Sequence, residues 1–288
     1  MSDARSTLPR GVKHHVYLPY RAGLPPMRRY FSDLWARRYF VAAYSRANIR
    51  AANTQTVFGQ IWLVLNPLLL AAVYYLLVSV LGGARLGSGA ALLAQITGGL
   101  FIFNLLSGAM MSGAQSIVSG GKLILNMNFP RLLMPLAAVR TSFLRFVPTI
   151  PVYLVIRAMT GEPWSWTMLL GLVYIALMVI FSIGLAALFA TLMVYFRDTT
   201  AFLPYITRIW LYASPVLWPV DRITDQWYAG LMNINPLFSL IGGWQQTTLH
   251  NTVPSAQSMG FAAAWAFGMF FFGGLLFMLR ERDFAVRI

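Results

Sequence analysis

The chain has 288 residues, of which 58% are hydrophobic and only 10% are charged, and its formal net charge is +14. Soluble domains carry about 25% charged residues, so this composition excludes an ordinary water-soluble globule and indicates a membrane protein. The positive charge does not indicate a nucleic-acid partner, because ten of the 22 Lys and Arg residues precede Gly59 and three lie in the last nine residues. Basic residues in such flanks hold helix ends at the cytoplasmic face of a membrane.

The N-terminal part is predicted to stay in the cytoplasm. Residues 1–26 form an irregular tail without the apolar stretch of a cleaved signal, and residues 27–58 form an interface helix, to about residue 44, and a connector. Phe31, Leu34 and Trp35 share one face of this helix, and Arg38 interrupts that face. The pattern predicts a helix lying on the cytoplasmic leaflet, with a solvated helix packed on protein as the alternative.

Residues 59–280 are predicted to form a permease domain with six transmembrane helices. A span needs roughly 20 apolar residues, and six stretches meet this length. They lie at about 60–82, 92–117, 132–158, 166–194, 201–219 and 258–279. The expected fold is therefore an all-α polytopic membrane protein, closed by a cytoplasmic tail at 281–288.

The connection between the fifth and sixth spans, about 220–257, is long and apolar for a loop. We expect an outer helical hairpin that either lies at the membrane interface or is partly re-entrant. Re-entrant backbone needs protein or a cavity around it.

Six crossings place both termini on one side, and the charges test this layout. Sixteen Lys and Arg residues fall in the segments assigned to the cytoplasm and three in the outer segments. This asymmetry predicts a plasma (inner) membrane protein with cytoplasmic N- and C-termini.

The chain lacks the groups that drive transport or catalysis. None of its eight acidic residues lies centrally in a predicted span, which argues against proton or sodium coupling and against a two-carboxylate hydrolase. Residues 120–123 come nearest to a phosphate loop, but Ser116 replaces the first glycine and Leu123 replaces the Ser or Thr that binds magnesium. We therefore expect no catalytic, cofactor or metal site here, and ATP and magnesium on a separate subunit.

Polar and aromatic residues within the spans are candidates for a substrate conduit. Arg140 and Arg145 lie in the third predicted span and Arg208 in the fifth; each either faces a polar conduit or bonds to a neighbouring helix. Trp210, Tyr212 and Trp218 surround Ser214-Pro215 and either stack on sugar rings or belong to the core and interfacial belts.

Five short motifs then stand in order along the chain: Gly59-Gln60-Ile61-Trp62 with Asn66-Pro67, Asn128-Phe129-Pro130-Arg131, Tyr195-Phe196-Arg197-Asp198, Tyr212-Ala213-Ser214-Pro215-Val216 and Asn235-Pro236-Leu237. From about Arg28 to its end the chain resembles the transmembrane subunit of type-II ABC exporters for polysaccharides, the Wzm and TagG group, which export O-antigen, galactan or teichoic acid.

The resemblance implies a homodimer with an ABC ATPase subunit beneath each copy and a polyprenyl-pyrophosphate-linked polysaccharide as cargo. It also implies that the segment from Gly120 to Pro130 is the coupling helix that enters a cleft of the ATPase. The coupling residues are then expected to be Gly121, Lys122, Leu123, Ile124, Leu125, Phe129, Pro130 and Arg131.

Two other functions are weighed against polysaccharide export. The first is export of a small molecule or drug by a permease of the same architecture. The second is a membrane enzyme acting on polyprenyl-linked sugars, which the absence of an Asp-x-Asp loop disfavours.

Overall fold

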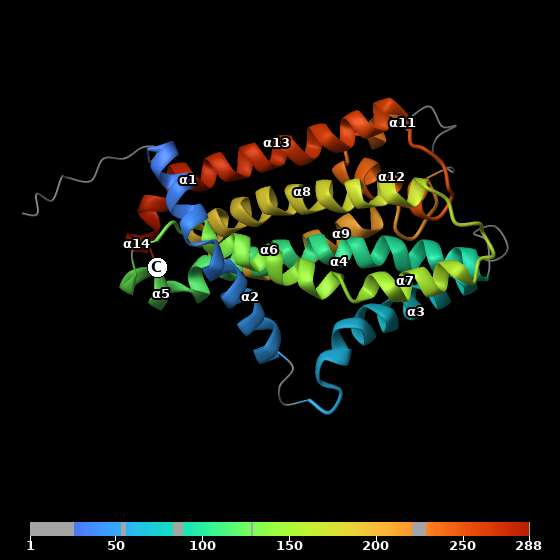
Figure 1. The fold of residues 1–288 in the computed structure, drawn as a ribbon, viewed down its shortest axis with the longest axis horizontal. Helices are drawn as coiled ribbons and strands as arrows, with labels where there is room; N and C mark the ends of the chain where they lie inside the picture. Colours follow the sequence, from blue (N-terminus) through green and yellow to red (C-terminus); the bar gives the residue numbers. More distant parts are fainter. Residues whose placement is uncertain (1–25, 53–55, 83–88, 128, 221–228, 288) are drawn as a thin grey trace, which may run out of the picture.

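A computed structural model describes residues 26–52, 56–82, 89–127, 129–220 and 229–287, and every regular element in these ranges is a helix (Figure 1). The helices are α1 (Met27–Ala36), α2 (Arg38–Ala52), α3 (Trp62–Gly82), α4 (Ala90–Ser119), α5 (Gly121–Asn126), α6 (Leu133–Phe146), α7 (Thr149–Ala158), α8 (Thr167–Tyr195), α9 (Thr199–Tyr212), α11 (Ala229–Met232), α12 (Pro236–Thr248), α13 (Ala256–Arg280) and α14 (Phe284–Arg287). Short 3₁₀ turns, η1 (Gly59–Ile61) and η3 (Glu281–Asp283), adjoin α3 and α13.

Five helical stretches in the described residues are long and apolar enough to cross a membrane, which confirms an all-α polytopic membrane protein. They are Gly59–Val80, Ala90–Ser119, Leu133–Ala158, Thr167–Tyr195 and Ala256–Asp283. The third of these bends where α6 passes into α7, because Pro148 lacks the N–H that would continue the helical ladder.

The fifth predicted span, 201–219, is not a continuous helix. It forms α9, whose 14 residues end at Tyr212 and are followed by turns. Pro215 disfavours the helical conformation of the residue before it, so the helix ends early. The apolar residues after Pro215 satisfy the length of a span in the sequence, but up to residue 220 they form turns and bends.

The core of the bundle is formed by α4, α8 and α13, whose backbones approach closely at glycines. A Cβ atom on Gly273 of α13 would lie 2.0 Å from the carbonyl oxygen of Gly184 in α8, and one on Gly184 would lie 2.2 Å from that of Met269. A Cβ atom on Gly113 of α4 would lie 2.5 Å from the Cβ and 2.8 Å from the Cα of Ala186 in α8. Glycine alone permits this contact, so small residues set the spacing of the central helices.

In contrast to this core, α3 is lightly packed. Only 11% of its apolar window is buried, and Leu69, Val73, Leu76 and Val80 are exposed. In Figure 1, α2 and α3 both slant away from the parallel helices. The inner side of α3 faces α4, and Tyr74 meets Tyr212 of α9 edge-on, with ring centroids 6.4 Å apart.

The segment predicted as an outer hairpin contains α11 and α12, and α12 lies within the bundle. It packs on α8, α13 and α4, and ten of its 13 residues are buried. Asn235 caps its first turn by accepting from the Leu237 N–H at 3.0 Å, and Pro236 occupies the first helical position. This arrangement agrees with the re-entrant alternative.

Arg157 holds the other end of α12 and is completely buried. Its Nε donates to the Thr248 carbonyl at 3.1 Å, and its terminal nitrogens donate to the carbonyls of Glu162 and Pro163 and to the Asn251 side chain. A buried guanidinium is tolerated when its N–H groups find acceptors in this way. Arg157 therefore fastens α7, α12 and the two loops beside them.

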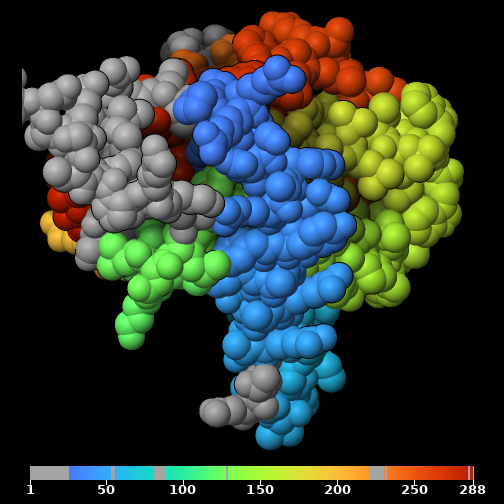
Figure 2. All heavy atoms as spheres, turned by 60° about the vertical axis from the view of Figure 1, so that its left-hand side comes forward, coloured from blue at the N-terminus to red at the C-terminus, as the bar shows by residue number. Residues whose placement is uncertain are grey.

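The opposite end of the bundle carries α1, α5 and α14, and we call it the α5 end (Figure 1). Figure 2 shows α1 and α2 running across the molecule beside α5. The single helix predicted from residue 27 to about 44 is two helices that meet at Arg37. Since α2 packs along α6, this N-terminal segment is partly attached to protein.

Candidate functional site

A pocket of about 480 Å³ lies between the inner side of α3 and helices α4 and α6; we call it the α3–α6 pocket. Its wall is mixed. Trp62, Phe101 and several aliphatic side chains supply apolar surface, and the polar groups are Asn66, Asn104, Ser107, Ser142, Arg145 and Thr149. Ser142 approaches Gly108, where a Cβ atom would lie 3.2 Å from the Ser142 Oγ, so a glycine keeps this part of the wall open.

Among the described residues that line this pocket, Arg145 alone is charged. It lies near the middle of the Leu133–Ala158 stretch, its side chain is exposed, and it makes no hydrogen bond or ion pair within the part of the chain that the structure describes. An arginine at such a depth costs about 2.5–3.5 kcal/mol or more when it faces lipid. Its position thus supports the conduit alternative of the two sequence-based readings.

Arg140 follows the other alternative, an inter-helix hydrogen bond. Its Nη1 donates to the Ala42 carbonyl at 3.1 Å and also to the Ser45 Oγ, so it fastens α2 to α6. Arg140 and Arg145 are five residues apart on one helix and therefore point in different directions. The structure thus assigns them different roles.

The remaining predicted conduit residues lie on α9 and in the turns that follow it. The Trp210 Nε1 donates to the Asn235 Oδ1 at 2.9 Å, and the Trp218 Nε1 donates to the Tyr212 carbonyl at 3.1 Å. Trp210 and Trp218 line a separate surface pocket of about 610 Å³ with Asn235, and Arg208 is exposed on α9. The structure therefore does not bring these four residues and Arg145 into one pocket.

Sequence reasoning missed most of the α3–α6 pocket. Asn104, Ser107 and Gly108 follow one another at helical spacing on α4 and interrupt an otherwise apolar span. Polar residues at three- and four-residue intervals share one helix face, and this signal indicates a polar wall. Which helix the wall faces depends on tertiary packing and cannot be deduced from the spacing.

At the α5 end, the predicted coupling residues divide into buried and exposed groups. Ile124 is 5% exposed and packs in a cluster with residues of α1, α6 and α14, and Gly121, Phe129 and Pro130 are also buried. Leu125 is 60% exposed, and Lys122 is exposed beside it. The outward surface of α5 is therefore made by Lys122, Leu125 and Asn126 and is continued by Met127, with Leu123 half-buried.

Arg131 joins the coupling segment to the end of α13. Its backbone N–H donates to the Glu281 Oε1 at 2.6 Å, and its guanidinium donates to the Glu281 carbonyl. The Tyr30 hydroxyl of α1 donates to the other carboxylate oxygen at 2.6 Å. Burial, followed by the neighbouring Glu281 carboxylate, raises the pKa of the Tyr30 phenol above its usual value, so Tyr30 remains a donor at neutral pH.

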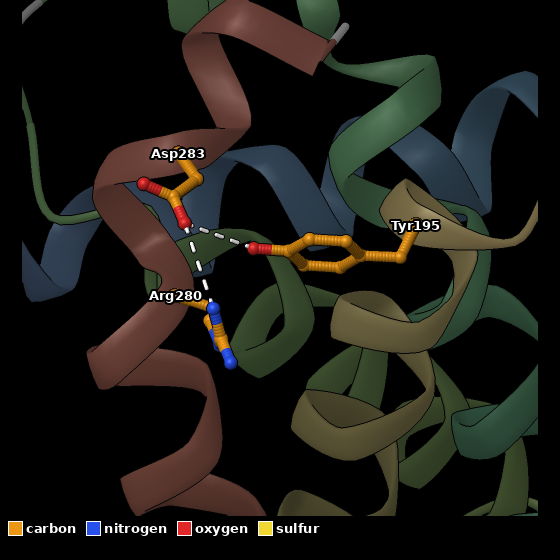
Figure 3. A network of polar contacts seen from close by, with 3 residues as sticks. All are labelled: Tyr195, Arg280 and Asp283. Carbon is orange, nitrogen blue, oxygen red and sulfur yellow. Dashed lines mark hydrogen bonds and ion pairs between the residues drawn. The ribbon is translucent and has the colours of Figure 1, made fainter.

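A second network connects α8 to the C-terminal segment (Figure 3). The Tyr195 hydroxyl donates to the Asp283 Oδ2 at 3.0 Å, and the Arg280 Nη1 lies 4.0 Å from the same oxygen. The Arg287 guanidinium lies over the Tyr195 ring, 4.4 Å from its centroid. These contacts order the end of α13 beside the coupling segment.

The predicted interface residues face two ways. Trp35 is 68% exposed and Phe31 is also exposed, whereas Leu34 packs against the protein. Arg38 donates to the Trp35 carbonyl at 3.1 Å, and its guanidinium lies 5.0 Å from the Trp35 ring centroid. One side of α1 therefore contacts protein, and the other presents aromatic rings outward.

Comparison with known proteins agrees with this architecture. The family model described as ABC-2 type transporter matches residues 39–249. The O-antigen export system permease protein RfbA of Myxococcus xanthus is 26% identical over 263 residues, 91% of this chain and 100% of its own. RfbA of Klebsiella pneumoniae is 28% identical over 207 residues, 72% of this chain and 78% of its own. The resemblance to type-II ABC exporters is thus confirmed, and this chain belongs to the ABC-2 type transporter family.

Proposed function

We propose that this chain is the permease subunit of an ABC exporter that moves a lipid-linked polysaccharide across the plasma membrane. The observation that carries the proposal is the similarity, over 91% of this chain and the whole of the relative, to a permease named for O-antigen export. The mixed polar and aromatic wall of the α3–α6 pocket supports a hydrophilic cargo.

The working assembly in this proposal contains two copies of the chain and two ABC ATPase subunits, which bind the ATP and magnesium. The exposed Leu69, Val73 and Leu76 of α3 support a second copy or lipid beside this helix. The chain is a transport subunit and performs no chemistry on its cargo.

The α5 end is proposed to lie in the cytoplasm, with both termini there. The excess of basic residues in the first 58 residues supports this orientation, because translocation disfavours Lys and Arg. The ATPase would then contact the outward surface of α5, where the apolar Leu125 lies beside Lys122. Movement of the ATPase would reach α13 and α1 through Arg131 and Glu281, which connect these segments.

Purified complex in vesicles tests the function. The chain, co-expressed with its partner ATPase subunit, should translocate a lipid-linked glycan in an ATP-dependent manner, and the glycan should stimulate ATP hydrolysis. The matched control is the same complex with an ATPase subunit that binds ATP without hydrolysing it. Stimulation by hydrophobic drugs with no response to the glycan would replace this proposal with small-molecule export.

A further inference from the structure

We propose that the α3–α6 pocket binds the phosphate-bearing headgroup of a lipid-linked glycan, with Arg145 as the residue that contacts the phosphate. The inference rests on the proposed function, and it places the headgroup of the cargo in the α3–α6 pocket.

The first argument is that Arg145 needs a counter-charge. Its guanidinium is always ionised and lies near the middle of an apolar stretch, and none of the described residues accepts a hydrogen bond from it or forms an ion pair with it. An ionised side chain at that depth is stable only beside water or an anion. A pocket of about 480 Å³ beside Arg145 provides room for both.

A second copy of the described chain has no carboxylate to offer at this depth. Asp33 lies in α1, Glu162 in the loop after α7, Asp198 at the start of α9, and Glu281 and Asp283 in η3. All five lie at the ends of the bundle. An anion that pairs with Arg145 would therefore come from outside the described residues, and the phosphate of a lipid headgroup is the anion that a bilayer brings beside α3.

The rest of the wall fits a phosphate joined to a sugar. The side-chain amides of Asn66 and Asn104 make no hydrogen bond within the described residues, so their N–H and C=O groups are available to a ligand. Trp62 offers an aromatic face of the kind on which sugar rings pack, and an N–H that can reach a hydroxyl. Guanidinium N–H groups bind phosphate oxygens in a bidentate manner.

The position of the pocket also suits a molecule that is half lipid. α3 is the least packed of the spanning stretches, and its exposed apolar side lies next to the pocket that its inner side lines. A headgroup in the pocket could therefore remain joined to a hydrocarbon chain that stays in the bilayer beside α3. A glycan without a lipid would gain nothing from this placement.

Equilibrium binding to the complete transporter in nanodiscs, without ATP, tests the site. The probe is a radiolabelled polyprenyl pyrophosphate that carries one sugar, and the comparison ligand is the matched polyprenyl glycoside without phosphate. We expect Arg145→Gln to weaken binding of the pyrophosphate probe about tenfold or more and to leave the uncharged ligand unaffected. Arg145→Lys should retain part of the affinity, because the charge remains while the bidentate geometry is lost.

Two further variants separate the pocket from general charge effects. Arg208→Gln removes an equally exposed arginine on α9, outside the pocket, and should bind the probe like the wild type. Ser107→Trp fills the pocket without changing charge and should weaken binding as Arg145→Gln does. The proposal is overturned if Arg145→Gln binds the probe normally, if Arg208→Gln loses as much affinity, or if the phosphate-free ligand binds as tightly.

Competition with phosphatidic acid distinguishes the two sources of lipid phosphate. Failure of phosphatidic acid to displace the probe supports a glycan-linked headgroup, whereas equal displacement overturns that assignment in favour of an ordinary phospholipid site. The site and the function can fail separately. If the Arg145→Gln variant binds the probe and exports normally, the proposed site is wrong and the proposed function stands. If the wild-type transporter exports no lipid-linked glycan, although binding of the probe depends on Arg145, the proposed function is wrong and the binding site stands.

Discussion

The Tyr30 hydroxyl donates a 2.6 Å hydrogen bond to the Glu281 carboxylate, although 251 residues separate the two in the sequence. The same carboxylate accepts from the backbone N–H of Arg131. One side chain at the end of α13 therefore holds both the N-terminal helix and the segment that follows α5. A substitution that changes this carboxylate should therefore also change the position of the segment that follows α5, beside the surface where an ATPase would dock.

Tyr30→Phe is expected to lower the free energy of unfolding by about 1.5–3 kcal/mol, because it removes a hydrogen bond to a charged group and leaves part of the Glu281 carboxylate unsatisfied. Thermal unfolding of the purified chain measures the loss. Since burial raises the pKa of the Tyr30 phenol, the difference should persist at neutral pH and shrink above about pH 10, where the phenol ionises in the unfolded chain but not in the folded one. The difference should also shrink at acid pH, where the Glu281 carboxylate takes up a proton. Tyr205→Phe, at an exposed tyrosine of α9, is the matched control and should have little effect.

Arg157→Met should destabilise the chain by about 3 kcal/mol or more, because four hydrogen bonds to buried or half-buried acceptors disappear together. Arg145→Gln in the same long stretch should cost less than about 1 kcal/mol, since Arg145 has no such bonds among the described residues. Unfolding temperatures of the two variants give the comparison. Similar losses would mean that the two arginines do not differ as the structure indicates.

Leu125→Asp should uncouple ATP hydrolysis from export while the chain remains folded and inserted, because Leu125 is exposed on the outward side of α5. Ile124→Asp places a charge in the cluster around Ile124 and should instead reduce the amount of folded protein. ATPase rate, export rate and unfolding temperature are measured on each variant. Normal export by Leu125→Asp would show that the coupling surface lies elsewhere.

Gly273→Ala should lower stability by about 1–3 kcal/mol, because its Cβ would lie 2.0 Å from the Gly184 carbonyl and the two helices would have to separate. Gly268→Ala, five residues earlier on the same helix, has no atom within 4 Å of the new Cβ and should be neutral. The yield of monodisperse protein after extraction and its unfolding temperature report the difference. Equal behaviour of the two variants would contradict the close approach of α8 and α13.

The sequence was sufficient to find the long spans, because an apolar run of fixed length has one structural meaning in a bilayer. The sequence was not sufficient to predict where α9 ends or that α12 is buried. Hydropathy counts apolar residues and does not distinguish a helix that crosses the membrane from one that enters it and turns back. The Pro215 signal was visible, but the burial of α12 depends on its packing against α8 and α4.

The candidate site was predictable in part for a similar reason. Arg140 and Arg145 are residues of the same type in the same predicted span, and only the position of α2 decides that the first is bonded and the second makes no hydrogen bond within the described residues. Likewise, Ile124 and Leu125 are adjacent apolar residues on a short helix, and the neighbouring α1 and α14 decide which is buried. The type of side chain shows which residues could line a pocket or form a docking surface. Contacts between helices far apart in the sequence decide which of them do so.

The contact of Gly273 with Gly184 has a consequence for movement. One turn away on either side of Gly273, the same face of α13 carries Met269 and Phe277, so an axial slide would drive a large side chain into the α8 backbone. α8 and α13 are therefore held in a fixed register and form the part of the permease that does not move. The opening and closing that export requires has to occur against this fixed pair, and α3, which the bundle holds least, is the element with room to move.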